Sequence, residues 1–419
     1  MTGKRRILFF AEAVTLAHVA RPIVLADSLD ATRYEAMVAC NARYARFVDG
    51  HAWRSLPLES IGGERFMRAL ASGSPVYDAA TLRDYVRADL RLIEAHRPDL
   101  VIGDFRLSLS VSCRLAGVPY AAVTNAYWSP YVVGLRNPLP VLPFTRVLPL
   151  PLARAIFNAA QPLAFALHCR PLNQVRREHG LSSLGSDLRR VYTDADHTLY
   201  ADVPGLFDLT ALPSNHHLLG PILWSPEASR PTWWDDPGAT GRPVVYVTLG
   251  SSGHTDVLIK VLDGLARLPV TVIASTAGQA VPQRTGGQLY LSDYLPGTEA
   301  ATRSALVICN GGSPTSQQAL AAGVPVLGVA GNMDQFLNMA AIEAAGAGLT
   351  LRADRLSDRR LQQAVERILQ VPDFRSASRM LASRIAQGDA TRRFTAWVDA
   401  LFDMPTTATG TAQGLHSAI

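Results

Sequence analysis

The chain has 419 residues, of which 48% are apolar and 18% charged, as in ordinary globular proteins. This length predicts two or three domains, each able to form its own core. The formal net charge is +5, but the basic residues are scattered and form no run interleaved with aromatic side chains. We therefore expect no nucleic-acid partner.

Cysteine usage and hydropathy favour a cytoplasmic protein. The four cysteines are far apart and form no CxxC pair, which is typical of free thiols in a reducing compartment. The first residues, KRRILFF, have the basic-then-apolar order of a signal peptide, but Glu12 ends the apolar run, so we expect a buried strand there. No stretch approaches the roughly 20 apolar residues of a membrane-spanning helix. At most, we expect peripheral membrane contact.

The N-terminal half alternates strand and helix patterns. Its expected strands are 6–10, 34–40, 100–103, 120–125 and 197–201, and its expected helices are 18–29, 77–96, 107–116 and 151–179. Continuously apolar strands between helices predict a parallel sheet covered on both faces. Residues 127–150 have no clean periodicity and are rich in Pro, Tyr, Trp and Leu.

A second alternating series follows a segment dense in Pro, Gly and Trp. Its expected strands are 244–249, 269–275, 288–292 and 348–352, and its expected helices are 255–267, 334–345 and 357–370. We predict an α/β protein of two doubly wound domains with a cleft between them. The predicted boundaries are 1–225 for the N-terminal domain, 226–242 for the linker, 243–403 for the C-terminal domain, and 404–419 for a disordered tail.

Residues 306–338 carry the strongest chemical signal. They read as a buried strand, a glycine turn, a helix capped by Ser313 with Pro314 at its start, a second strand, and Asp334-Gln335. The N–H groups at a helix N-terminus attract phosphate, and the missing Cβ atoms of Gly311 and Gly312 would allow its approach. A carboxylate and an amide beyond the next strand suit a polyhydroxylated group. This pattern predicts a nucleotide-sugar site.

Four segments together resemble the family 1 glycosyltransferases of GT-B fold, which include UDP-glucosyl- and UDP-glucuronosyltransferases and bacterial natural-product glycosyltransferases. The segments are VYVTLGSSG at 245–253, SDYLPG at 292–297, CNGGSPTSQQALAAGVPVLGV at 309–329 and NMDQFLN at 332–338. The resemblance implies two Rossmann-like domains whose parallel sheets face each other across a cleft. It also implies an N-terminal acceptor-binding domain and a C-terminal donor-binding domain.

The resemblance assigns the catalytic base to His18, at the junction of the first strand and first helix. Imidazole titrates near neutrality and can take a proton from an acceptor hydroxyl. Pro22 follows at the family's spacing, whereas Ala17 replaces the usual glycine. Asp104 is the implied partner that orients the imidazole. On the residues alone, a capping histidine and a strand-end turn aspartate are equally ordinary readings.

The resemblance also implies a set of donor-binding residues. They are Gly250, Ser251, Ser252, Tyr294, Asn310, Gly312, Ser313, Thr315, Gln318, Asp334 and Gln335. On the residues alone, several of them could instead have purely structural roles. Residues 250–252 could form a tight turn, Tyr294 could be a core aromatic residue, and Asp334 could be an aspartate that the dipole stabilises at a helix N-terminus. Two positions depart from the family, since Asn310 replaces a histidine and Gln318 replaces the glutamate that holds the ribose hydroxyls. The neutral amides make a dTDP-sugar donor more plausible than usual.

A metal-binding DxD triplet occurs as Asp194-Ala195-Asp196, far in sequence from the phosphate turn. A lone DxD is frequent, so we expect a structural role here, no metal site and no cofactor. There is also no GxGxxG near the first strand, which argues against a dinucleotide cofactor.

These features predict an inverting, metal-independent glycosyltransferase that uses a UDP- or dTDP-sugar. The apolar, aromatic region 127–168 predicts a hydrophobic or aromatic small molecule or lipid as acceptor. Two alternatives remain: a nucleotide-sugar epimerase of the same fold, and a catalytically silent nucleotide-sugar-binding protein that activates a partner.

Overall fold

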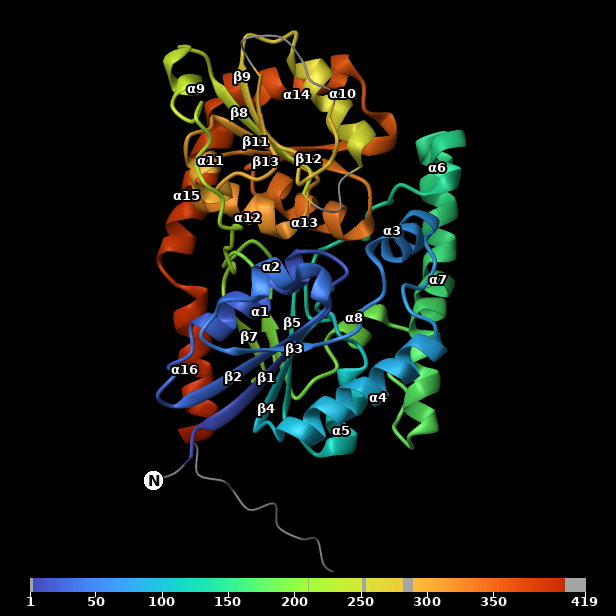
Figure 1. Cartoon of the computed structure of the whole chain (residues 1–419). Coiled ribbons are helices and arrows are strands. Elements are labelled where there is room, and N and C mark those ends of the chain that lie inside the picture. The colour runs from blue at the N-terminus through green and yellow to red at the C-terminus, as the bar shows by residue number, and fades with distance from the viewer. Residues whose placement is uncertain (1–2, 210, 251–253, 282–288, 404–419) are drawn as a thin grey trace, which may run out of the picture.

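A computed structural model describes residues 3–209, 211–250, 254–281 and 289–403. The predicted donor residues Ser251 and Ser252 and the predicted disordered tail 404–419 lie outside the described residues. Within them, the chain forms two parallel sheets in two domains, one stacked above the other (Figure 1).

The N-terminal domain is built on a seven-stranded sheet in the order β3-β2-β1-β4-β5-β6-β7. The strands are β1 (Arg5–Ala11), β2 (Tyr34–Cys40), β3 (Arg54–Pro57), β4 (Leu100–Asp104), β5 (Tyr120–Thr124), β6 (His197–Tyr200) and β7 (His216–Leu218). The helices are α1 (Ala17–Asp27), α2 (Ala45–Val48), α3 (Gly63–Ser72), α4 (Ala79–His96), α5 (Leu109–Ala116), α6 (Pro143–Val147), α7 (Leu150–Glu178) and α8 (Leu188–Tyr192). Helices cover both faces of the sheet, so β4 is buried along its whole length and β1 over all but its first two residues.

The C-terminal domain is built on a six-stranded sheet in the order β10-β9-β8-β11-β12-β13. The strands are β8 (Val244–Thr248), β9 (Thr271–Ser275), β10 (Leu289–Ser292), β11 (Leu306–Cys309), β12 (Val326–Ala330) and β13 (Gly348–Arg352). The helices are α9 (Asp236–Ala239), α10 (Thr255–Leu265), α11 (Gly297–Thr302), α12 (Ser313–Ala321), α13 (Met333–Ala344), α14 (Asp358–Gln370) and α15 (Pro372–Ala386).

Strand order explains where a site should form. In each sheet the order reverses between two neighbouring strands, at β1 and β4 in the first and at β8 and β11 in the second. Ligands of open α/β sheets bind beyond the carboxyl ends of the strands at such a reversal. Asp104 ends β4 and Asn310 follows β11, and both side chains line the same cavity between the domains.

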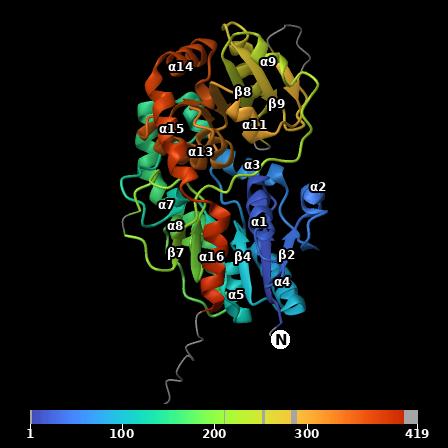
Figure 2. The ribbon, with the colours of Figure 1, turned by 90° about the vertical axis from the view of Figure 1, so that its left-hand side faces the viewer.

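The last helix, α16 (Ala390–Asp403), returns to the first domain. Phe394 and Val398 of this helix join the core beneath the N-terminal sheet, although the sequence placed 243–403 in the second domain. Figure 2 shows α16 beside the N-terminal strands, below α15. The chain thus passes between the domains twice, and the second passage lies against the first. A Cβ added at Gly220 would lie 3.9 Å from the carbonyl oxygen of Gly388.

Candidate active site

His18 and Asp104 form a short, partly buried pair. Asp104 Oδ1 lies 2.7 Å from Nδ1 of His18, and the carboxylate is fully buried while the imidazole side chain is 19% exposed. A carboxylate on Nδ1 fixes the tautomer that carries its proton there, which leaves Nε2 as the basic nitrogen. His18 lines the cavity between the domains, so a proton acceptor faces the space that a substrate would occupy.

Arg21 is a third member of this pair that the sequence reasoning missed. Its buried guanidinium places Nη2 2.9 Å from Oδ1 of Asp104 and Nε 2.7 Å from Oδ2. Arg21 follows His18 by three residues, so both side chains leave the same face of α1, a spacing that could have indicated the contact. The Asp104 charge raises the pKa of Arg21 above its ordinary value even though burial opposes this. The carboxylate is therefore held between two nitrogenous groups.

Phe105 holds the imidazole from the other side. Its ring stacks on that of His18, with centroids 4.8 Å apart and planes inclined by 16°. Its φ of +59° lies in the left-handed region, which is costly for a bulky residue and is maintained at functional sites by surrounding packing. The turn after β4 thus directs Asp104 and Phe105 to the same histidine.

The predicted phosphate turn is present, with two corrections. Gly312 is the residue before α12, and Ser313 is the first helical residue, so Ser313 does not cap the helix. Its hydroxyl lies 3.5 Å from Oδ1 of Asn125 in the other domain. Gly311 has a φ of +82°, and a Cβ there would lie 2.8 Å from Cγ of Met339. Gly311 is therefore required by the turn and by packing against α13, rather than by an approaching anion.

The two amide substitutions occupy different surroundings. The Asn310 side chain lines the cavity, and its Oδ1 accepts a bond of 2.9 Å from the backbone N–H of Gly312. Gln318 also lines the cavity, but its Nε2 donates to the backbone carbonyl of Trp224 in the segment that joins the domains. Gly312 and Thr315 line the same cavity. An amide donor at 318 is therefore matched to a carbonyl acceptor.

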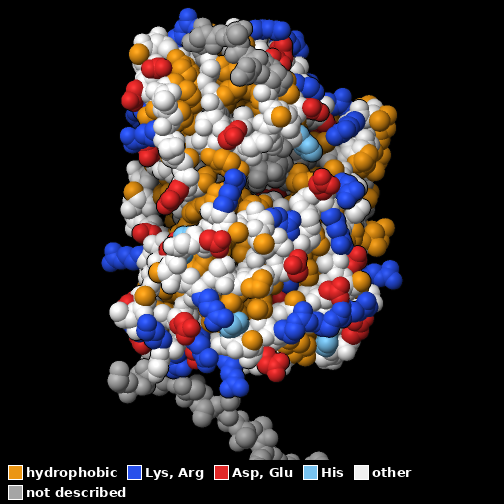
Figure 3. Space-filling model, viewed as in Figure 1, with side chains coloured by type: hydrophobic (Ala, Val, Ile, Leu, Met, Phe, Trp, Pro, Cys, Tyr) orange, Lys and Arg blue, Asp and Glu red, His pale blue; other side chains and the backbone are white. Residues whose placement is uncertain are grey.

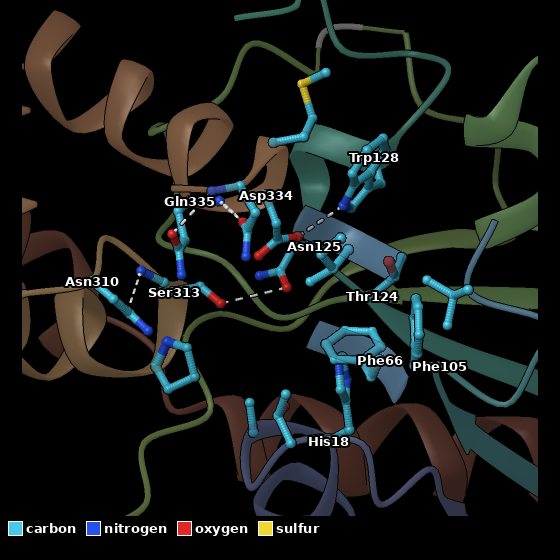
Figure 4. A pocket seen from close by; sticks show the side chains of 18 of the residues that line it. His18, Phe66, Phe105, Thr124, Asn125, Trp128, Asn310, Ser313, Asp334 and Gln335 are labelled. Carbon is cyan, nitrogen blue, oxygen red and sulfur yellow. Dashed lines mark hydrogen bonds between the residues drawn. The ribbon is translucent and has the colours of Figure 1, made fainter. Parts of the chain in front are cut away.

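Asp334 and Gln335 begin α13 beside the turn. The indole N–H of Trp128 donates to Asp334 Oδ1 across 2.9 Å, so the carboxylate is held by the opposite domain (Figure 4). The Gln335 side-chain oxygen accepts the backbone N–H of Gly331 at 2.8 Å and that of Asn332 at 3.3 Å. Gln335 therefore caps its own helix through the oxygen, and only its amide nitrogen is left for a ligand.

Tyr294 and Gly250 also line the cavity. The Arg46 guanidinium stacks 4.8 Å above its ring and donates to its hydroxyl. Phe47 packs edge-on against the same ring, with centroids 6.3 Å apart. These two residues belong to α2 of the N-terminal domain, and sequence periodicity did not indicate this short helix. A cation and an aromatic ring of the N-terminal domain thus hold the Tyr294 ring of the C-terminal domain.

A buried polar network joins Arg21, beside His18, to α12 across the two domains. Arg21 Nη1 donates to Oδ1 of Asn125 at 3.0 Å, and the amide of Asn125 donates to Asp202 at 3.0 Å. Gln317 of α12 donates to the carbonyl of Ala201 at 2.8 Å. Burial raises the pKa of Asp202 to about 6 despite these donors. The network fixes the position of α12 relative to α1, so the two predicted half-sites form one site.

A cavity of ≈ 510 Å³ is lined by most of these residues, including His18, Arg21, Asp104, Asn125, Asn310, Asp334 and Gln335. Next to His18, its wall in the N-terminal domain is mainly apolar. The residues of that wall are Phe66, Met67, Leu70, Val76, Phe105, Leu107, Trp128, Leu142, Phe144, Ile156, Phe157, Phe165 and Tyr192. The opposite wall carries the glycine turns and the polar side chains described above. The cavity therefore combines a hydrophobic chamber with a polar chamber, and His18 lines it.

The DxD triplet has structural partners. Asp194 forms ion pairs with Arg114 at 2.8 Å and Arg176 at 2.5 Å, and Asp196 accepts the backbone N–H of Tyr120 at 2.9 Å. Within the described ranges, no group of three or more His, Cys, Asp or Glu side chains could hold a metal ion.

Comparisons with known proteins agree with this geometry. Residues 259–392 match the family described as Erythromycin biosynthesis protein CIII-like, C-terminal domain. A PGL/p-HBAD biosynthesis rhamnosyltransferase of Mycobacterium bovis is 54% identical over 379 residues, 90% of this chain and 84% of that protein. A PGL/p-HBAD biosynthesis glycosyltransferase of Mycobacterium tuberculosis is 52% identical over 379 residues, 90% of this chain and 88% of that protein.

Solved structures give the same fold. The spinosyn rhamnosyltransferase SpnG, 18% identical, covers 95% of this chain with a TM-score of 0.68 over the whole of that chain. It has also been solved with thymidine diphosphate. The two facing parallel sheets and the mycobacterial relatives together show that this chain is a glycosyltransferase and belongs to the family 1 glycosyltransferases of GT-B fold.

Proposed function

We propose that the enzyme is an inverting, metal-independent glycosyltransferase that moves a sugar from a nucleotide-diphosphate sugar to a hydroxyl of a hydrophobic acceptor. The observation that carries this proposal is the position of His18. Its basic nitrogen faces a cavity that has an apolar chamber on one side and the α12 phosphate turn on the other. An acceptor and a donor bound in these chambers would meet at the imidazole.

In the proposed step, His18 Nε2 takes the proton of the acceptor hydroxyl as its oxygen bonds to the anomeric carbon. The bond from that carbon to the diphosphate oxygen breaks, and the nucleotide diphosphate leaves with the electron pair. The N–H groups at the start of α12 would stabilise the negative charge that develops on this leaving group. Attack from the side opposite the leaving group inverts the anomeric configuration.

We propose a dTDP-sugar as donor and rhamnose as the sugar. The neutral side chains of Asn310 and Gln318 support the nucleotide assignment. The Gln318 amide donates to the Trp224 carbonyl, so no carboxylate is available there for ribose hydroxyls. A 54% identical relative is named a rhamnosyltransferase, which supports the sugar, and SpnG binds thymidine diphosphate.

A thermal-shift screen over UDP-, dTDP- and GDP-sugars tests the donor without an acceptor, because a bound ligand raises the melting temperature. We expect dTDP-rhamnose to give the largest shift. Transfer to a 4-alkylphenol should then proceed in EDTA and give one anomer, opposite to that of the donor. Strict dependence on Mn²⁺, retention of configuration, or release of free sugar epimer without a glycoside would refute the proposal.

A further inference from the structure

The outer edge of α6 and α7 exposes an unusual amount of hydrophobic surface. Among the described residues, ten large hydrophobic side chains are exposed, and half of them lie within residues 147–167. They are Val147 (83% exposed), Leu152 (50%), Ile156 (42%), Leu163 (66%) and Leu167 (47%). These five residues are called the apolar edge below. Figure 3 shows hydrophobic side chains and Lys or Arg side chains together along the side of the molecule where Figure 1 places α6 and α7.

The apolar edge is continuous along α7. Leu152, Ile156, Leu163 and Leu167 are separated by four, seven and four residues, which places them in one narrow stripe of a helix with 3.6 residues per turn. The opposite face of α7 is packed, through Ala153 and Phe157 near its start and through Cys169 and Leu172 near its end. The stripe is therefore not needed for the core and has no cover within the described chain.

The charges around the apolar edge indicate which kind of surface could bind it. No Asp or Glu occurs from residue 105 to residue 177, whereas eight arginines do. Arg146, Arg154 and Arg170 are exposed on α6 and α7, and none of them has an ion-pair partner among the described residues. A helix with an apolar stripe and unpaired cations, whose one acidic residue is Glu178 at its C-terminal end, fits the boundary of an anionic lipid bilayer.

The apolar edge also leads into the active-site cavity. Ile156 belongs to both, since it is exposed and lines the cavity together with Phe157, Ala160 and Phe165 of the same helix. None of the described helices has the length and hydrophobicity needed to span a bilayer. Contact with a membrane through this helix would therefore be at its surface, with the apolar chamber directly behind the contact.

We propose that the apolar edge and its arginines dock the enzyme on an anionic phospholipid bilayer, so that a lipid acceptor enters the cavity past α7 without crossing water. The route of the acceptor rests on the proposed function, whereas docking itself does not. Docking is therefore tested without donor or acceptor.

The test is co-sedimentation of the full chain with vesicles of phosphatidylcholine, with and without phosphatidylglycerol. We expect binding to the anionic vesicles that weakens as salt is raised. Leu163→Ser/Leu167→Ser should weaken it roughly tenfold or more, because each leucine loses its burial in the bilayer interface. Arg154→Gln/Arg170→Gln should weaken it by about fivefold per arginine for anionic vesicles only.

Met380→Ser is the matched control, because Met380 is 61% exposed on α15, away from the apolar edge. It should bind vesicles like the wild type, and equal melting temperatures would show that all variants are folded. The rise in melting temperature on adding dTDP-rhamnose measures donor binding independently of membrane binding. If the wild type shows no such rise, the proposed function is contradicted but docking is not. Absence of vesicle binding by the wild type, or equal binding by Leu163→Ser/Leu167→Ser, would overturn the proposal. A wild-type dimer that this double variant converts to a monomer would also overturn it, because a second copy would then cover the edge.

Discussion

Asp104 is expected to act on catalysis only through His18, and a double-mutant cycle measures this. Its Oδ1 lies 2.7 Å from Nδ1 of His18, and the carboxylate is completely buried, so it is shielded from bulk solvent. A positioned general base contributes roughly 100- to 10,000-fold to the rate, or about 3 to 5 kcal/mol. We expect His18→Ala to lose this amount in kcat/KM, and Asp104→Asn to lose about 100-fold or more because the imidazole tautomer is no longer fixed.

The double variant tests whether Asp104 acts only by orienting His18. If Asp104 only orients His18, His18→Ala/Asp104→Asn should be no slower than His18→Ala alone, within about threefold, since the two groups form one unit. The assay is nucleotide diphosphate release with dTDP-rhamnose and a 4-alkylphenol, and donor-induced thermal shift verifies that each variant still binds donor. Removing the carboxylate also leaves the buried Arg21 unpaired, so Asp104 variants should lose about 3 to 5 kcal/mol of stability and are assayed below their melting temperature. If the double variant instead lost kcat/KM by the product of the two single losses, Asp104 would act independently of His18 and the reasoning would be refuted.

Three further predictions concern stability. Gln318→Glu should lower the melting temperature, because a carboxylate would face the Trp224 carbonyl, and an unchanged melting temperature would contradict this. Gly311→Ala should cost about 1 to 3 kcal/mol in urea unfolding, since its φ is +82° and the new Cβ would meet Met339, and an unchanged midpoint would disprove the packing argument. Burial raises the Asp202 pKa from the ordinary 3.8 to about 6, so its contribution to stability is complete below pH 4 and is lost as pH rises through 6, by roughly 3 kcal/mol. Asp202→Asn should lack this dependence, and parallel stability curves for variant and wild type between pH 4 and 7 would show the assignment wrong.

The fold was predictable because its signals are local. Continuously apolar strands such as 34–40 and 100–103, separated by amphipathic helices, correspond within a few residues to β2 and β4, and the GT-B resemblance is confirmed. The return of α16 to the first domain was not predictable. Phe394 and Val398 repeat at helical spacing, which shows that one face is buried but not which sheet covers it.

The candidate site was predictable only as a list of positions. The family resemblance indicated His18 and Asp104, and the structure places them 2.7 Å apart. Arg21 was missed because an arginine on a helix is usually a solvated surface residue, and its burial depends on Asp104 and Asn125 from other strands. The role of Gly311 was misjudged because Met339, which fills the space beside it, is remote in sequence.

The paired passages of chain between the domains limit how the cleft can open. Arg393 at the start of α16 donates to the carbonyl of Leu219 at 3.1 Å, beside the contact between Gly220 and Gly388. Leu219 and Phe394 belong to the same N-terminal core, so this bond fastens α16 to the first domain. Both passages therefore join the domains at one edge, and the chain must bend there when one domain moves on the other. Any widening of the cavity would also break bonds between the domains, such as those from Gln317 to the Ala201 carbonyl and from Trp128 to Asp334.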